Sequence, residues 1–242
     1  GVQTCALPIW QPRALMLWAN RNGFFYVLDR ATGEFLSGTP FVKVNWASGL
    51  DENGRPIQTP QPEGEPTWPG NQGGTNWYPP SYSPSTGLFY FAAWEDYATI
   101  YEPEESEYIP GRYFLGGGFS VLAPVEGAPT IGIGRTSPIN NWTDVVGYGS
   151  VKALDPSTGE EVWAFDQFDV TDSGMLTTAS DLLFTGGREG YFHALDARTG
   201  ELLWKASLGG QIVMAPVTYT VNGEQYVTVI SGNSMVTFGL RD

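Results

Sequence analysis

The sequence predicts an all-β fold in which one strand–turn–strand unit recurs, as it does in the blades of a β-propeller. The 242 residues include 31 glycines and 18 prolines, a content that suits many short strands joined by turns better than a helical bundle. An Asp-x-x-Thr-Gly turn between two strand-like segments occurs three times. Asp155 and Asp196 begin two of these turns and are 41 residues apart, a period typical of propeller blades.

The three copies of the unit align without gaps over residues 22–34, 148–160 and 189–201. In each copy the aspartate can accept hydrogen bonds from backbone amides two residues further on, and the glycine tolerates the positive φ at which the hairpin reverses. Asp29, Asp155 and Asp196 are therefore interpreted as turn residues and not as paired catalytic carboxylates.

Other segments predict further strands. Residues 82–90 carry a Pro-Ser-Thr-Gly turn before an aromatic strand, and we interpret them as one more blade. The spacing of 126 residues between Asp29 and Asp155 is close to three blade periods. Residues 225–232 and 235–240 supply two β-rich strands. We expect about four to five four-stranded blades in all.

Two copies of the unit extend to a tryptophan at a fixed offset. Both have the frame Ala-x-Asp-x-x-x-Gly-x-x-x-Trp, and its defining residues are Ala153, Asp155, Gly159 and Trp163 in one copy and Ala194, Asp196, Gly200 and Trp204 in the other. A tryptophan at this offset can lie flat between neighbouring blades, where the small alanine leaves room for the indole. We therefore expect these eight residues to be structural.

The charge and the ends of the chain restrict its class. The formal net charge is −14 and the isoelectric point is about 4.3, so the surface should repel phosphate backbones, and we expect no nucleic-acid partner. There is no run of about 18 apolar residues, which predicts that the chain is not transmembrane.

Residues 1–9, which hold the single cysteine, Cys5, match one reading frame of a common sequencing adapter and are interpreted as non-native. Residues 10–242 are then the partial propeller.

The eleven-residue frame resembles the tryptophan-docking motif of quinoprotein propellers. Other stretches resemble the branch of that family that oxidises alcohols with pyrroloquinoline quinone (PQQ), and they are residues 21–30, 44–47, 53–56, 73–77 and 113–118. The similarity runs from about Leu15 to Leu240. It implies the C-terminal part of an eight-bladed PQQ-dependent alcohol dehydrogenase that transfers hydride from an alcohol to the quinone. It also implies calcium or a lanthanide, an electron acceptor that is a cytochrome c or a quinone, and a periplasmic location.

The resemblance assigns cofactor contacts to three residues. Arg21 stands where the family has a cation near the reactive carbonyl of the quinone, and Asn76 stands where it has a donor to the polar edge of the cofactor. Trp77 would line the same funnel. The family's catalytic aspartate and calcium ligands lie upstream, so this fragment should contain neither and be inactive. Two cofactor-side tryptophans of the family are missing here, where residues 171–179 and 233–235 stand instead.

Each of these assignments has an alternative. Arg21 could be a surface arginine at the start of a strand, and Asn76 could cap a turn. His193 occupies a repeat position that Lys152 and Tyr26 fill in the other copies, which favours an ordinary strand residue. The whole chain could belong to a non-catalytic PQQ-repeat propeller that acts as an interaction scaffold, as in outer-membrane protein assembly. Repeats alone do not separate a scaffold from an enzyme.

Overall fold

A computed structural model of the chain describes residues 2–5, 13–61, 64–103, 105, 107–112, 114, 117–121 and 147–239. Among these residues the regular elements are all strands, and every pair of neighbouring strands is antiparallel. No helix able to cross a bilayer is found in this part of the chain. The prediction of an all-β fold is confirmed.

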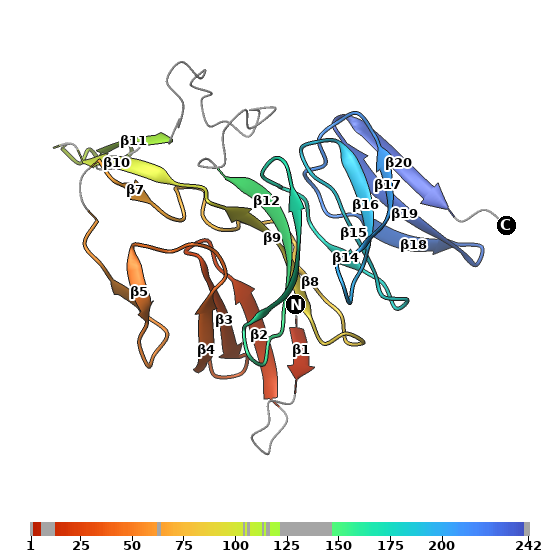
Figure 1. Cartoon of the computed structure of the whole chain (residues 1–242), viewed down its shortest axis with the longest axis horizontal. Helices are drawn as coiled ribbons and strands as arrows, with labels where there is room; N and C mark the ends of the chain where they lie inside the picture. Colours follow the sequence, from red (N-terminus) through yellow and green to blue (C-terminus); the bar gives the residue numbers. More distant parts are fainter. Residues whose placement is uncertain are drawn as a thin grey trace.

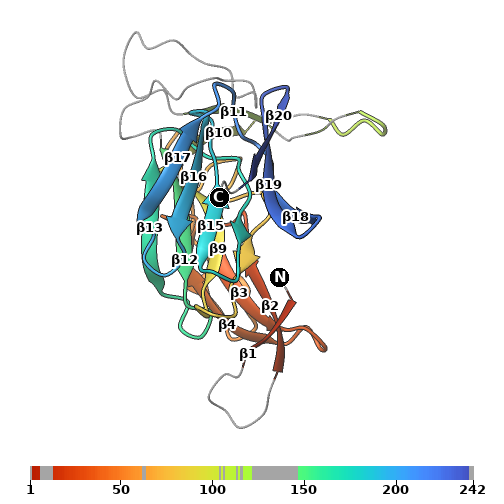
Figure 2. The same cartoon turned by 90° about the vertical axis from the view of Figure 1, so that its right-hand side faces the viewer.

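Four sheets follow one another along the chain and lie side by side as the blades of a partial β-propeller (Figures 1 and 2). Blade I contains β1 (Val2–Cys5), β2 (Arg13–Ala19), β3 (Phe24–Asp29) and β4 (Phe35–Pro40). Blade II contains β8 (Ser81–Tyr82), β9 (Phe89–Glu95), β12 (Tyr148–Leu154) and β13 (Glu161–Gln167). Blade III contains β14 (Leu176–Thr177), β15 (Leu182–Thr185), β16 (Tyr191–Asp196) and β17 (Leu202–Ser207). Blade IV contains β18 (Val217–Val221), β19 (Glu224–Ser231) and β20 (Ser234–Gly239).

Two smaller sheets lie between blades I and II in the sequence. A hairpin pairs β5 (Ala47–Leu50) with β6 (Pro56–Gln58). A three-stranded sheet pairs β10 (Thr99–Pro103) with both β7 (Pro66–Thr67) and β11 (Gly117–Val121). In Figure 1 β10 and β11 lie at the upper left of the molecule, where β10 continues from the end of β9.

The interpretation of residues 82–90 as a separate blade is wrong. These residues form β8 and β9, and β9 pairs along its whole length with β12 of the Asp155 repeat. The spacing between Asp29 and Asp155 therefore reflects one blade with long insertions, not three blade periods. The described residues contain four blades, the lower end of the expected number.

The hydrophobic core lies between the blades. Between blades I and II it includes Phe25, Val27, Phe89 and Phe91, and the rings of Phe25 and Phe89 are 5.4 Å apart. Between blades II and III it includes Tyr90, Trp163, Leu183 and Leu195. Between blades III and IV it includes Phe192, Ile212 and Val229. Each blade is thus stabilised by its neighbours, as expected when stacked repeats bury a shared core.

The adapter interpretation of residues 1–9 stays a prediction. Residues 2–5 form β1, which pairs with β2, while residue 1 and residues 6–9 lie outside the described part of the chain. Pairing of four residues at the edge of blade I says nothing about their coding origin.

Candidate functional site

The strand order divides the turns between two faces of the propeller. Because consecutive strands of a blade are antiparallel, successive turns alternate between the two ends of the strands. The Asp-x-x-Thr-Gly turns between β3 and β4, β12 and β13, and β16 and β17 lie at one end, and we call this side of the propeller the turn face. The turns between β2 and β3 and between β15 and β16 lie at the other end, together with the connections that lead into β8, β14 and β18. We call that side the connection face. All three predicted cofactor contacts lie on the connection face.

Arg21 lies in the turn between β2 and β3, against the glycine-rich connection that leads to β8. Its Nη2 donates a hydrogen bond to the backbone oxygen of Asn71 at 2.6 Å, and its own backbone oxygen accepts from the N–H of Gly74 at 3.0 Å. A Cβ atom on Gly73, whose φ is +85°, would lie 2.8 Å from the Cα of Arg21. Only glycine fits this approach, so the structure brings Arg21 and the segment that contains Asn76 together.

Asn76 and Trp77 follow directly on this connection. The side-chain amide of Asn76 donates to the backbone oxygen of Gln72 at 3.1 Å, and its Oδ1 accepts from the N–H of Trp77 at 3.0 Å. Asn76 therefore stabilises its own turn, as the alternative interpretation expects. Trp77 is half-exposed, and its ring lies 5.3 Å from that of Tyr78.

The connections into three successive blades meet on this face. The N–H of Met175, before β14, donates to the backbone oxygen of Pro79, before β8, at 2.9 Å. A Cβ atom on Gly174 would lie 2.6 Å from the Cβ of Ala215, before β18. The segment 171–179, where the resemblance implies that a family tryptophan is missing, is thus in contact with the segment of Trp77 on one side and with the connection into blade IV on the other.

One pair of residues on the connection face was missed at the sequence level. Arg188, in the turn between β15 and β16, donates from Nε to Oδ2 of Asp172 at 2.8 Å, and the two side chains are only 8% and 7% exposed. The guanidinium carbon of Arg188 lies 5.4 Å from the ring centre of Trp94. The signal was present in the repeat alignment, because Arg188-Glu189-Gly190 occupies the same position as Arg21-Asn22-Gly23.

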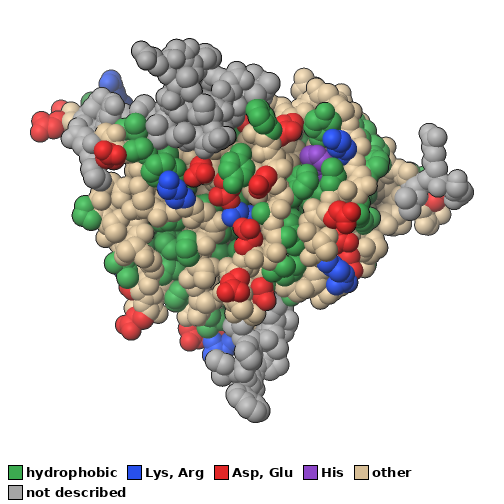
Figure 3. All heavy atoms as spheres, in the orientation of Figure 1, with side chains coloured by type: hydrophobic (Ala, Val, Ile, Leu, Met, Phe, Trp, Pro, Cys, Tyr) green, Lys and Arg blue, Asp and Glu red, His purple; other side chains and the backbone are tan. Residues whose placement is uncertain are grey.

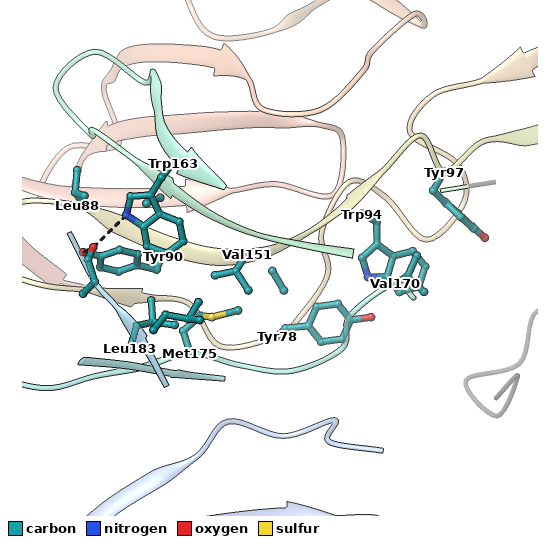
Figure 4. Close-up of a cluster of buried hydrophobic side chains, with 14 residues drawn as sticks. Tyr78, Leu88, Tyr90, Trp94, Tyr97, Val151, Trp163, Val170, Met175 and Leu183 are labelled. Carbon is teal, nitrogen blue, oxygen red and sulfur yellow. Dashed lines mark hydrogen bonds between the residues drawn. The ribbon is translucent and has the colours of Figure 1, made fainter. Parts of the chain in front are cut away.

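The two tryptophans of the eleven-residue frame lie in different surroundings. Trp163 is 8% exposed, and its Nε1 donates to the backbone oxygen of Ala197 in the next blade at 3.1 Å, drawn as the dashed line in Figure 4. Trp204 is 43% exposed and contacts Phe238 of blade IV at 5.3 Å between ring centres. Trp204 lines a groove of about 440 Å³ between blades III and IV.

The remaining residues of the frame lie in the strands and turns where the repeat predicts them. Oδ1 of Asp155 accepts from the N–H of Ser157 at 2.8 Å, and Oδ1 of Asp196 accepts from the N–H of Arg198 at 2.7 Å. Gly159 and Gly200 both have a φ of +75°. Ala153 and Ala194 are buried and lie directly across the strand pair from Trp163 and Trp204. The equivalent Asp29 accepts from the backbone N–H of Thr32, which lowers its pKa.

His193 is buried on β16 beside Phe165 and Tyr191. Burial lowers its pKa, and Lys205 adds to this effect while Glu189 opposes it. A histidine whose folded-state pKa is depressed is held neutral, so the fold should lose stability as the pH falls below about 6.5, the unfolded value.

We expect the unfolding free energy of the His193→Gln variant to decrease less between pH 7.5 and 5.5 than that of the parent, measured by urea unfolding. Equal decreases in the two proteins would contradict this assignment.

The described residues contain no group of three or more metal-ligating side chains. Acidic side chains are instead scattered over the face shown in Figure 3.

A family model described as "Outer membrane protein assembly factor BamB" matches residues 147–242. The chain is 39% identical to the quinoprotein alcohol dehydrogenase PedH of Pseudomonas putida over 228 residues, covering 88% of the chain and 35% of the relative. It is 38% identical to a 1-butanol dehydrogenase (cytochrome c) of Thauera butanivorans over 233 residues, covering 92% of the chain and 31% of the relative.

Solved structures agree with these relatives. The quinohemoprotein alcohol dehydrogenase ADHIIG of Pseudomonas putida superposes with a TM-score of 0.82 at 30% identity, covering 97% of this chain and 34% of that one. A europium-containing methanol dehydrogenase superposes with a TM-score of 0.78 at 30% identity, covering 94% of this chain and 38% of that one. The chain thus spans about a third of the length of the proteins it matches.

Proposed function

We propose that the whole protein oxidises an alcohol by transferring hydride to PQQ, because this chain is part of a quinoprotein alcohol dehydrogenase-like β-propeller. The observation that carries the proposal is the similarity to alcohol dehydrogenases of 38–39% identity along 88–92% of the chain. These relatives are about three times as long as the matched region, so we expect the chain alone to be inactive. By "whole protein" we mean the product of the longest reading frame that contains this chain.

The connection face carries three side chains that could contact a planar, anionic quinone. PQQ supplies the carbon that accepts the hydride, and the protein supplies orientation and electrostatics. The Arg21 guanidinium, held at the backbone oxygen of Asn71, would stabilise negative charge that develops on a quinone oxygen. The amide of Asn76 has a second hydrogen beyond the one bound to Gln72 and can donate it to a ligand. The half-exposed Trp77 offers an apolar wall.

The metal and the electron acceptor are proposed from the relatives. A calcium or lanthanide ion would polarise the quinone, and the europium-containing methanol dehydrogenase among the similar structures favours a metal at this site. Its ligands and the catalytic aspartate would come from outside the described residues. Relatives named for cytochrome c and for quinone support either of these as acceptor. We also propose a periplasmic location.

A scaffold function is the second candidate. It is favoured by the match of residues 147–242 to the BamB family model. That match covers the region of the two complete eleven-residue frames, which are repeat features common to both kinds of propeller. The Arg21 turn and the Gly73–Trp77 connection lie outside it, whereas the similarity to the 1-butanol dehydrogenase covers 92% of the chain and includes both.

Activity of the whole protein tests the proposal. We expect it to bind PQQ in the presence of calcium and to reduce a dye when an alcohol is added. Replacing Arg21 by alanine should lower that activity by about 100-fold, the order of magnitude for loss of one preorganised electrostatic contact. Arg13→Ala is the matched control, because Arg13 pairs with Glu34 on the exposed surface of the same blade. A folded whole protein that neither binds PQQ nor reduces dye would favour the scaffold.

A further inference from the structure

The Arg188–Asp172 ion pair is buried, whereas Arg21, the counterpart of Arg188 in the repeat, is exposed. Arg188 and Arg21 hold the same position in two copies of the repeat and in equivalent turns of blades III and I. Arg21 lies on the surface and donates to a backbone carbonyl, whereas Arg188 lies in the interior and donates to a carboxylate. The two arginines therefore have different partners and different exposure on the same face.

Stability alone does not explain the buried pair. Removing two charges from water costs more than their attraction returns unless the remaining polar atoms are also satisfied. Oδ1 of Asp172 is buried and has no hydrogen-bond partner among the described residues. A pair with such an unsatisfied oxygen is expected to be retained for the placement of its neighbours, not for its own contribution to stability.

Those neighbours form a continuous chain of contacts to Trp77. The Arg188 guanidinium lies over the ring of Trp94 within the range of a cation–π interaction. Trp94 is stacked against Tyr78 with ring centres 6.4 Å apart and planes inclined by 20°, an arrangement visible in Figure 4. Tyr78 in turn contacts Trp77.

The same pair fixes the other side of this arrangement. Nε1 of Trp94 donates to the backbone oxygen of Thr171 at 2.7 Å, the residue that precedes Asp172. The ion pair and this hydrogen bond thus hold Trp94 from two directions. Trp94 of blade II is thus contacted by Arg188 of blade III and by the connection that leads into β14.

We propose that Arg188 and Asp172 are positioning residues for the planar anionic quinone expected on the connection face. They act through Trp94 and Tyr78 on Trp77, and they do not contact the ligand themselves. This inference rests on the proposed function, because the ligand that Trp77 would contact is the cofactor.

Binding of PQQ by the whole protein, without alcohol, tests this role. PQQ is titrated in the presence of calcium while tryptophan fluorescence is recorded, and the thermal unfolding midpoint is measured for each variant without PQQ. We expect Arg188→Met to raise the dissociation constant of PQQ about tenfold or more, because small displacements of a contact surface have large effects. Arg188→Lys should recover only part of the affinity, since an ammonium lacks the planar fork. Arg198→Met is the matched control, because Arg198 pairs with Asp181 on the turn face of the same blade, and it should leave PQQ binding unchanged.

The outcomes separate this inference from the proposed function. Weaker binding by Arg188→Met and partial recovery by Arg188→Lys, each measured at a temperature well below the unfolding midpoint of that variant, support the positioning role. Unchanged binding, or a loss of affinity that follows the loss of thermal stability and also occurs in Arg198→Met, overturns it while the function stands. A parent that does not bind PQQ overturns the function and this role with it. If Arg188→Met does not fold, Arg188→Lys decides: parent-like affinity overturns the role, and reduced affinity at a parent-like midpoint supports it.

Discussion

Replacing Trp163 by alanine is expected to lower the free energy of unfolding by about 3–5 kcal/mol, the range for large aromatic side chains removed from a core. The indole is buried between blades II and III and donates a hydrogen bond to Ala197. It also packs closely on Gly200, where an added Cβ would lie 2.6 Å from the ring. The variant would leave both a cavity and a weakened contact between the blades.

Trp204→Ala is the matched control for Trp163→Ala, because both tryptophans occupy the same place in the repeat. Trp204 is 43% exposed, so its removal should cost less, about 2 kcal/mol. Urea unfolding of this chain, residues 1–242, and of each variant of it, followed by circular dichroism, measures the difference. Equal losses for the two variants would show that the blade contact of Trp163 does not contribute as the structure indicates.

Replacing Lys152 by methionine is expected to lower the free energy of unfolding by about 3 kcal/mol at neutral pH. Nζ of Lys152 lies 2.5 Å from Oε1 of Glu95, 2.8 Å from Oε2 of Glu161 and 2.6 Å from the backbone oxygen of Phe41 in blade I. Burial lowers the pKa of Lys152, but its hydrogen bonds to the two glutamates outweigh this effect and raise the pKa. Without the ammonium, Glu95 is left as a buried carboxylate with no counter-charge.

The loss in Lys152→Met should depend on pH. Burial raises the pKa of Glu95 in the folded protein, and Lys152 opposes that rise, so the pKa should rise further in the variant. A carboxyl whose folded-state pKa is raised costs stability as the pH rises above its unfolded value. The difference between parent and variant should therefore be larger at pH 7.5 than at pH 4.5 in urea unfolding. Glu95→Gln added to Lys152→Met should recover part of the stability at pH 7.5, and no recovery would contradict this account.

The sequence predicts this fold well wherever the repeat is intact. The spacing of Asp155, Gly159 and Trp163 is sufficient to place two strands and a turn, because that turn is closed by local hydrogen bonds. The pairing of β9 with β12 could not be predicted, because more than fifty residues separate these adjacent strands and include strands of another sheet. Strand pairing across an insertion depends on tertiary contacts that have no local signature.

The candidate site shows the same division. The position of Arg21 could be predicted from its motif, and the structure places it against the connection that contains Asn76. The partner of Arg188 could not, because Asp172 lies sixteen residues away and the repeat contains no matching carboxylate. The different exposure of Trp163 and Trp204 could not be predicted either, because it depends on which residues of the following blade contact each indole and not on the eleven-residue frame itself.

The backbone oxygen of Ala197 accepts two hydrogen bonds from blade II, one from Trp163 and one from the hydroxyl of Tyr90 at 2.8 Å. Because the acceptor is a main-chain atom, any residue small enough for the buried position 197 that keeps the turn conformation presents the same oxygen. The donors, by contrast, are specified by two particular side chains. A repeat unit of this kind therefore needs only a small residue at its acceptor position to be bound by the neighbouring blade. Duplicated or exchanged blades would remain compatible as long as the aromatic donors are inherited.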